Sequence, residues 1–183
     1  MKETKLRDIV WNDAITIASP HPYVLATSVD ARGKPNIIGL GWWTICSWDP
    51  PMMLVSVGKK KYSRECIDAG REFVVCLLGE EHAAGAWVCG TKGGRKIDKF
   101  KEAGFTPAPS KAVKPPTIGE SLLAFECKVK QTVEAGDHIL YVGDVVAIRG
   151  TGEQKRHLYS IHYSKLVAVG PDGSVGLDLP FKG

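Results

Sequence analysis

Residues 22–43 read PYVLATSVDARGKPNIIGLGWW, two strand-forming runs separated by a turn. In the first run, the odd-numbered residues 23–29 share one face of an extended chain and the even-numbered residues share the other. The intervening DARGKP (30–35) opens with aspartate, contains a glycine that tolerates positive φ, and closes with proline, which is typical of a turn. The stretch therefore predicts a β-hairpin that pairs Pro22–Asp30 with Asn36–Trp43.

Further strands are predicted downstream. Phe73–Leu78 is apolar throughout, as in a strand buried on both faces. In Leu123–Val133, apolar and polar residues alternate, so Glu126 lies on the face opposite the apolar side chains. A turn at Gly136-Asp137 joins this strand to its hairpin partner. The other predicted strands are Met52–Val57, Ile139–Arg149 and His162–Val169, and a glycine- and aspartate-rich tail follows the last of them.

Short helices are expected between the strands. Ser63 is a suitable N-cap for a helix that runs to Ala69 and stops at Gly70. The other expected helices cover Glu80–Val88 and a segment in which Ile97, Phe100 and Ala103 share one face before Gly104.

Antiparallel hairpins with helices inserted between them predict a mainly β fold, an antiparallel, closed or partly closed β-barrel with short α-helices. A doubly wound parallel sheet would require strands and helices to alternate regularly, and here they do not. The 183 residues suffice for one domain, so we expect residues 1–183 to form a single domain.

Composition limits the function classes. The chain is 44% hydrophobic and 24% charged, and its net charge of +4 suits an anionic small molecule at least as well as nucleic acid. The absence of a signal peptide and of an apolar run of roughly 18–20 residues makes the cytoplasm the expected location, with no membrane span. The five cysteines form no CxxC pair, so neither a disulfide framework nor a metal site is expected; three of them are expected to act as small hydrophobes, Cys46, Cys76 and Cys127.

Tryptophans cluster just after the first hairpin, at Trp42, Trp43 and Trp48. Two interpretations stay open: the three rings pack the core, or they form an apolar slot for a ligand. Small residues that would let a ligand approach the backbone lie among them, namely Gly39, Gly41 and Ser47.

Three other clusters could bind a ligand. Lys61-Tyr62-Ser63 stands at an expected helix start, where free N–H groups, a hydroxyl and a lysine suit an anion, although an ordinary N-cap beside solvated lysines would look the same. GTKGGRKIDKF (90–100) is glycine-rich and basic but lacks the P-loop pattern. His138, at a hairpin turn, could contact a ligand or accept a proton, or could simply be exposed. No catalytic triad, GxSxG or GxGxxG motif is present.

The order of these clusters resembles the flavin reductase-like FMN-binding split barrels, and within them the flavoredoxin branch. The resemblance covers about Ser19 to Val169 and rests on five short stretches in order: NIIGLGWWTICSWDPP (36–51), KKKYSRECIDAGREFVVCL (59–77), GTKGGRKIDKF (90–100), FECKV (125–129) and GDHILYVGDVV (136–146). It implies a Greek-key split barrel, a homodimer, and FMN held non-covalently in a groove at or near the dimer interface.

The resemblance also assigns roles to residues. The isoalloxazine ring would be lined by Gly41, Trp42, Trp43, Thr44 and Ile45. The 5′-phosphate would be held by Lys61 and Ser63, with Tyr62 beside them. Thr91 and Lys92 would approach the phosphate or the ribityl chain, and His138 would lie near the flavin and the incoming nicotinamide. Asp98-Lys99-Phe100 matches a structural motif. Many relatives carry Thr or Ser in place of Gly39 and Gly41, and the paired tryptophans are bulkier than usual.

Two functions follow from the resemblance. In the first, the protein is an oxidoreductase in which NAD(P)H reduces bound FMN, which then reduces a flavin, ferric iron or a partner protein. In the second, it is an FMN-holding electron carrier without NAD(P)H activity of its own, which the crowded tryptophan pair favours. A third reading, a nucleic-acid-binding barrel, is disfavoured by the modest charge and by the acidic residues among the basic ones.

Overall fold

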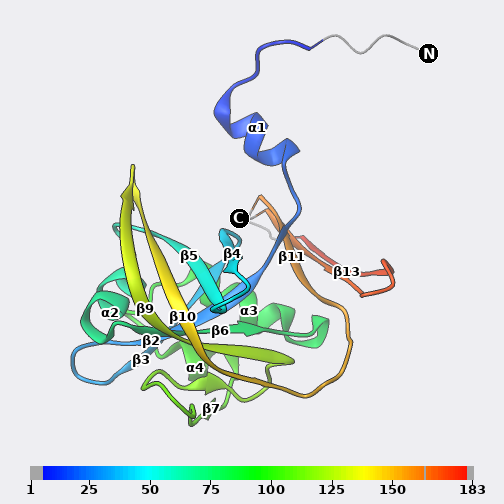
Figure 1. Ribbon diagram of the computed structural model, residues 1–183. Helices are drawn as coiled ribbons and strands as arrows, with labels where there is room; N and C mark the ends of the chain where they lie inside the picture. Colours follow the sequence, from blue (N-terminus) through cyan, green and yellow to red (C-terminus); the bar gives the residue numbers. More distant parts are fainter. Residues whose placement is uncertain (1–5, 163, 181–183) are drawn as a thin grey trace.

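The computed structural model describes residues 6–162 and 164–180, and its centre is a strongly curved antiparallel sheet (Figure 1). Its seven strands lie in the order β3-β2-β6-β9-β10-β5-β4, and every pair is antiparallel. The strands are β2 (Val24–Val29), β3 (Pro35–Leu40), β4 (Trp43–Ser47), β5 (Met52–Gly58), β6 (Glu72–Leu77), β9 (Leu123–Ala135) and β10 (His138–Gly150).

The sheet order contains a Greek key. Strands β6, β9 and β10 follow one another, and β5, which precedes them in the chain, lies on the far side of β10. The backbone N–H of Ser56 in β5 donates to the carbonyl of Trp42, just after β3, at 2.9 Å. The end of β3 thus lies against β5, and the sheet curls into the split barrel expected from the sequence.

Two smaller sheets complete the β-structure. A four-stranded sheet has the order β1-β11-β12-β13, with β1 (His21–Pro22), β11 (His157–Ile161), β12 (Lys165–Val169) and β13 (Val175–Pro180). It is joined to the barrel because β1 leads directly into β2, and the Tyr23 N–H donates to the Leu158 carbonyl at 2.8 Å. A two-stranded sheet consists of β7 (Pro107–Ala108) and β8 (Thr117–Ile118).

The helices are short: α1 (Trp11–Ile17), α2 (Tyr62–Gly70), a 3₁₀ turn η1 (Glu80–His82), α3 (Ala83–Thr91) and α4 (Lys99–Ala103). Helix α1 stands away from the barrel and buries none of its residues (Figure 1). Helices α3 and α4 pack on each other and on β3, and α2 packs on β2 and β3. In the described residues, no helix is both long enough and apolar enough to cross a membrane.

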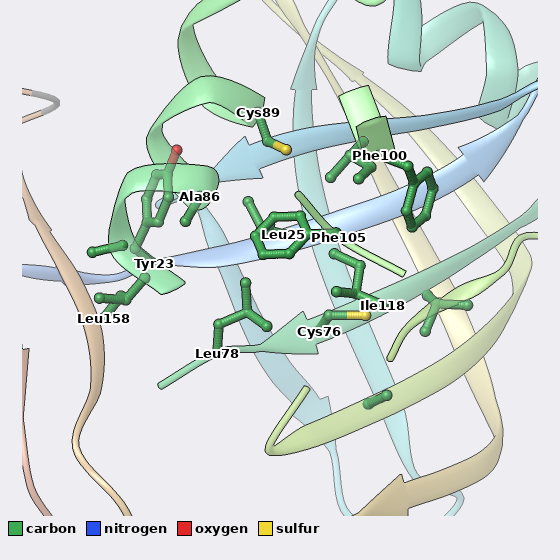
Figure 2. Packing of buried hydrophobic residues seen from close by; sticks show 14 of the residues in the cluster. Tyr23, Leu25, Cys76, Leu78, Ala86, Cys89, Phe100, Phe105, Ile118 and Leu158 are labelled. Atoms are coloured by element: carbon green, nitrogen blue, oxygen red, sulfur yellow. The ribbon is translucent and has the colours of Figure 1, made fainter. Parts of the chain in front are cut away.

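Strand β2 separates two hydrophobic clusters and is buried on both faces. Tyr23 and Leu25 belong to the cluster beneath α3 and α4, which also contains Ala86, Cys89 and Phe100, and Figure 2 shows the Tyr23 ring beside Ala86. Val24 and Ala26 belong to the cluster inside the barrel. The predicted alternation is therefore confirmed, with apolar contacts on both sides instead of one.

Several local predictions are wrong. Helix α2 begins two residues early, with Lys61 at the N-cap position, so Ser63 lies within its first turn, and no side chain caps the helix. Gly70 is the last helical residue and not the stop. The cap is Arg71, which takes the left-handed conformation (φ 54°) and whose N–H still donates to the Ile67 carbonyl. The last predicted strand, His162–Val169, is confirmed only from Lys165 on, as β12. β11 was not predicted and ends at Ile161, just before His162 (φ 42°), and the tail forms β13.

Further differences concern α1, which the polar N-terminal sequence did not predict, and β4, which follows β3 after a break at Gly41 and Trp42. Cys76 and Cys127 are buried as small hydrophobes, but Cys46 lies exposed on β4, a correction to its expected role in the core. All five cysteines are free thiols.

Glu126 faces away from the barrel interior yet is fully buried. The connector between β7 and β8 covers it, and its carboxylate accepts the backbone N–H groups of Lys111 (2.8 Å) and Ala112 (2.6 Å). A buried carboxylate with two amide donors is well satisfied, so Glu126 fixes the connector on the sheet.

We predict that Glu126→Gln lowers the free energy of unfolding by about 2 kcal/mol, because the new amide NH₂ meets a backbone donor without an acceptor. Urea denaturation followed by tryptophan fluorescence measures the change. Lys128→Gln, two residues along β9 and exposed, is the control and should change stability by less than about 0.5 kcal/mol. Equal stability of the two variants would contradict the assigned role of Glu126.

Candidate functional site

A cavity of about 780 Å³ opens between β3, the start of α2, the end of α3 and the turn before β10. Its size falls in the range of small-molecule and cofactor sites. It collects residues from segments that are far apart in the sequence: Ile15, Tyr23, Asn36, Ile38, Gly39, Leu40, Trp42, Ser56, Gly58, Lys60, Lys61, Tyr62, Ser63, Trp87, Gly90, Thr91, Lys92, Gly93, Gly94, Arg95, Lys96, Lys99, His138 and His162.

Tyr23 sets the wall between β3 and α3. A Cβ placed on Gly39 would lie 1.8 Å from the Tyr23 hydroxyl oxygen, and one on Gly90 would lie 2.1 Å from it. Only glycine at both positions leaves room for this ring, so the loss of Thr or Ser at Gly39 is explained by packing of Tyr23. The contact holds the C-terminal end of α3 against β3.

One end of the cavity is built on the first turn of α2. Asn36 on β3 and Ser63 on α2 are both about 3% exposed, and the Asn36 Nδ2 donates to Ser63 Oγ at 2.7 Å. The Asn36 Oδ1 is buried and has no hydrogen-bond partner among the described residues. Lys61 precedes the helix in extended conformation, next to N–H groups that the helix itself does not use.

The loop after α3 closes this end. The Arg95 guanidinium lies 4.7 Å from the centre of the Tyr62 ring and forms an ion pair with Glu65. The Tyr62 hydroxyl donates to Asp30 Oδ2 at 2.8 Å, and this hydrogen bond, with burial, raises the pKa of Tyr62 to about 12. The same bond is the main cause that lowers the pKa of Asp30.

Thr91 and Lys92 line the cavity but already have partners. The Thr91 hydroxyl donates to the Trp87 carbonyl at 2.8 Å, one helical turn earlier, and Lys92 forms an ion pair with Glu102. Both side chains lie at the exposed rim, so either could exchange its partner for a ligand.

Aromatic rings line the adjoining part of the cavity, its aromatic end. The rings of Trp42 and His138 have centroids 5.0 Å apart and are tilted by 44°. His138 Nδ1 lies 2.7 Å from Asp137 Oδ1, and its side chain is one quarter exposed. A Cβ on Gly58 would lie 3.7 Å from His138 Nε2, so this nitrogen sits over a glycine of the cavity wall.

The structure brings together seven of the residues expected at the site: Trp42, Lys61, Tyr62, Ser63, Thr91, Lys92 and His138. The remaining four lie outside the lining. Gly41 is buried, Thr44 and Ile45 are exposed on β4, and Trp43 donates its indole N–H to the Pro22 carbonyl at 2.8 Å. Their contact with a flavin therefore stays a prediction.

The sequence did not single out several cavity residues: Asn36, Trp87 and His162, and, within the basic stretch 90–100, Arg95 and Lys99. Lys99 belongs to a motif that was interpreted as structural, yet its side chain also reaches the cavity wall. A lysine at an otherwise inward-facing helix position is the one sequence signal that could have found it. The described residues contain no cluster of three or more metal-ligating side chains.

Comparison with known proteins gives one consistent family. The model of the flavin reductase like domain matches residues 17–166. An uncharacterized protein of Pyrococcus abyssi is 38% identical over 114 residues, 62% of this chain and 65% of that protein, so the match spans just under two thirds of the relative. An NADH:riboflavin 5′-phosphate oxidoreductase of Streptomyces pristinaespiralis is 31% identical over 132 residues, 72% of each chain.

A solved structure gives the same result. The crystal structure of a flavoredoxin from Methanosarcina acetivorans superposes with a TM-score of 0.72 and 25% identity, and the match covers 100% of this chain and 94% of that chain. The split-barrel fold derived from the strand order is thus confirmed independently.

We predict that Gly94→Ala destabilises the protein by about 1–3 kcal/mol, because its Cβ would lie 1.8 Å from Asn36 Oδ1 and displace the Asn36–Ser63 pair. The neighbouring Gly93→Ala is the matched control: Gly93 has no positive φ, and its Cβ would meet nothing within 4 Å. Urea denaturation compares the two. Similar stability of both variants would show that the loop does not pack on Asn36.

Proposed function

The chain belongs to the flavin reductase-like family, and from this premise we propose that it binds FMN in the cavity and works as an oxidoreductase through it. The observation that carries the proposal is that one cavity holds a cationic end, at Lys61 and the first turn of α2, and an aromatic end, at Trp42 and His138, which adjoin at Gly58. FMN has the same division, a phosphate of charge near −2 and a planar ring.

The cationic end fits the phosphate. Free N–H groups at a helix start and a lysine beside them favour an anion. The Ser63 hydroxyl accepts from Asn36, so its own proton is available to a phosphate oxygen. Asn36 Oδ1, a buried acceptor without a partner among the described residues, suits a ribityl hydroxyl as donor.

The aromatic end fits the ring. Trp42 offers an apolar face, and two small residues, Ser56 and Gly58, also line the cavity, where they leave room for a planar ring. When bound, FMN would supply the capacity to accept a hydride and to pass electrons on singly or in pairs.

His138 is the residue that we propose to position a nicotinamide. The Asp137 carboxylate accepts from Nδ1, which leaves Nε2 of the neutral ring as a hydrogen-bond acceptor beside Gly58. A nicotinamide carboxamide N–H is a matching donor. In this reading NAD(P)H donates a hydride to bound FMN, and the reduced flavin delivers electrons to a flavin, ferric iron or a partner protein.

The second candidate is an electron carrier that holds FMN and receives electrons from a partner protein. The likeness to a flavoredoxin over the whole chain favours it. Crowding by the Trp42–Trp43 pair does not favour it. Trp43 donates to the Pro22 carbonyl, and of this pair only Trp42 lines the cavity. The homodimer implied by the sequence resemblance stays a prediction.

We predict that Lys61→Gln weakens FMN binding tenfold or more, since a charge-assisted phosphate bond contributes roughly 1.5–3 kcal/mol, and leaves riboflavin binding unchanged. Quenching of flavin fluorescence measures both affinities. Lys101→Gln removes the same charge from the exposed side of α4 and should alter neither. An equal loss for FMN and riboflavin would place the phosphate elsewhere.

The purified protein with FMN should bleach near 450 nm when NADH or NADPH is added without oxygen. His138→Asn should slow that bleaching at least tenfold while the FMN affinity stays the same, and His21→Asn, outside the cavity, should leave both unchanged. Stopped-flow absorbance gives the rates. Bound FMN that neither nicotinamide reduces, but a reduced partner protein does, would support the electron carrier instead.

A further inference from the structure

Lys99 is a buried lysine that has no carboxylate partner among the described residues. It is 6% exposed, and its ammonium donates to the backbone carbonyls of Ile37 on β3 and Cys89 on α3, both at 2.6 Å. No carboxylate in the described part of the chain lies within ion-pair distance of it. At the exposed rim of the cavity, by contrast, Lys92 and Arg95 are paired with glutamates.

Two carbonyls do not complete the coordination of an ammonium. A lysine ammonium has three N–H donors, so the two carbonyls leave one N–H without an acceptor. Burial has also removed most of the water that would otherwise solvate the charge. Burial of an unpaired charge is costly, and two neutral acceptors offset it only in part. The side chain lines the cavity, so this is the direction from which a further acceptor can come.

The groups that face Lys99 supply no negative charge. Lys61, at the start of α2, adds repulsion across the cavity. On α3 the nearest titratable group is the Cys89 thiol, whose pKa burial raises to about 12, so it is neutral. Arg95 and Lys96, from the loop, are cationic, and β3 supplies a neutral acceptor, the Ile37 carbonyl.

We propose that Lys99 is a ligand-binding residue, whose ammonium meets the anionic group of the ligand from the wall of the cavity between β3 and α3. The proposal rests on FMN as the ligand, whose 5′-phosphate is that anionic group. It assigns Lys99 a role in recognition in addition to its structural role between β3 and α3. A phosphate bound near both lysines would be attracted by each ammonium and would offset the repulsion between them.

The arrangement has a consequence for pH. Burial, and then the charge of Lys61, lower the pKa of Lys99 to about 8 in the free protein. A bound phosphate favours the charged form and raises this pKa. Below pH 8 the ammonium is already charged and affinity is at its plateau. Above pH 8 the free protein has lost the proton and must regain it on binding, so affinity falls.

The wild-type protein provides the first test. We expect the dissociation constant for FMN to rise about tenfold between pH 7.5 and pH 9, with no such rise for riboflavin, which lacks the phosphate. Calorimetry at pH 8.5 in buffers of different ionisation enthalpy should show uptake of a proton with FMN and none with riboflavin. FMN binding without proton uptake and without this pH dependence would overturn the proposal.

Variants provide the second test. Lys99→Met should weaken FMN binding at pH 7.5 at least tenfold and abolish the pH dependence, and Lys99→Arg, charged throughout, should bind FMN with a flat profile. Lys101→Met on the same helix is the control and should behave as wild type. Wild-type affinity and pH profile in Lys99→Met would refute the role. If the wild-type protein binds no FMN at any pH, the proposed function itself fails, a separate result.

Discussion

Burial of strand β2 on both faces is the constraint on which the site depends. One face fills the barrel, and the other carries Tyr23 and Leu25 into the cluster beneath α3 and α4. Because the Tyr23 ring fits only where Gly39 and Gly90 lack side chains, β3 and the end of α3 are held at a fixed spacing. The loop that follows α3 is then placed against Asn36, and the cavity is the space that remains between them.

Cationic side chains line this cavity at different depths. At the exposed rim, Lys92 is paired with Glu102 and Arg95 with Glu65. Lys61 lies at the helix start, and Lys99 is buried with two carbonyl partners. A buried cation attracts an anion more strongly than an exposed one, because less water screens it. A phosphate that reaches Lys99, with an aromatic ring beside Trp42, matches this arrangement.

The sequence was sufficient for the hairpins and for the class of fold, because the period-two pattern and the DARGKP turn are local signals. It was insufficient where a neighbour distant in sequence decides. Ser63 reads as an N-cap, but Asn36 from β3 holds it inside the helix. Glu126 reads as an outward-facing acid, but the β7–β8 connector buries it. Lys99 reads as part of a structural motif, and only the packing of α4 on β3 brings it to the cavity. The three clustered tryptophans also have different roles, which the sequence could not separate. Trp42 lines the site, Trp43 donates to the Pro22 carbonyl, and Trp48 is 92% exposed.

The central claim is that FMN occupies this cavity with its phosphate at the start of α2. A crystal structure of the protein grown with FMN tests it most directly. The account predicts phosphate oxygens within hydrogen-bond distance of Ser63 Oγ and of the ammonium groups of Lys61 and Lys99, with the ring beside Trp42. A flavin in the reverse orientation, or bound outside the cavity, would contradict it.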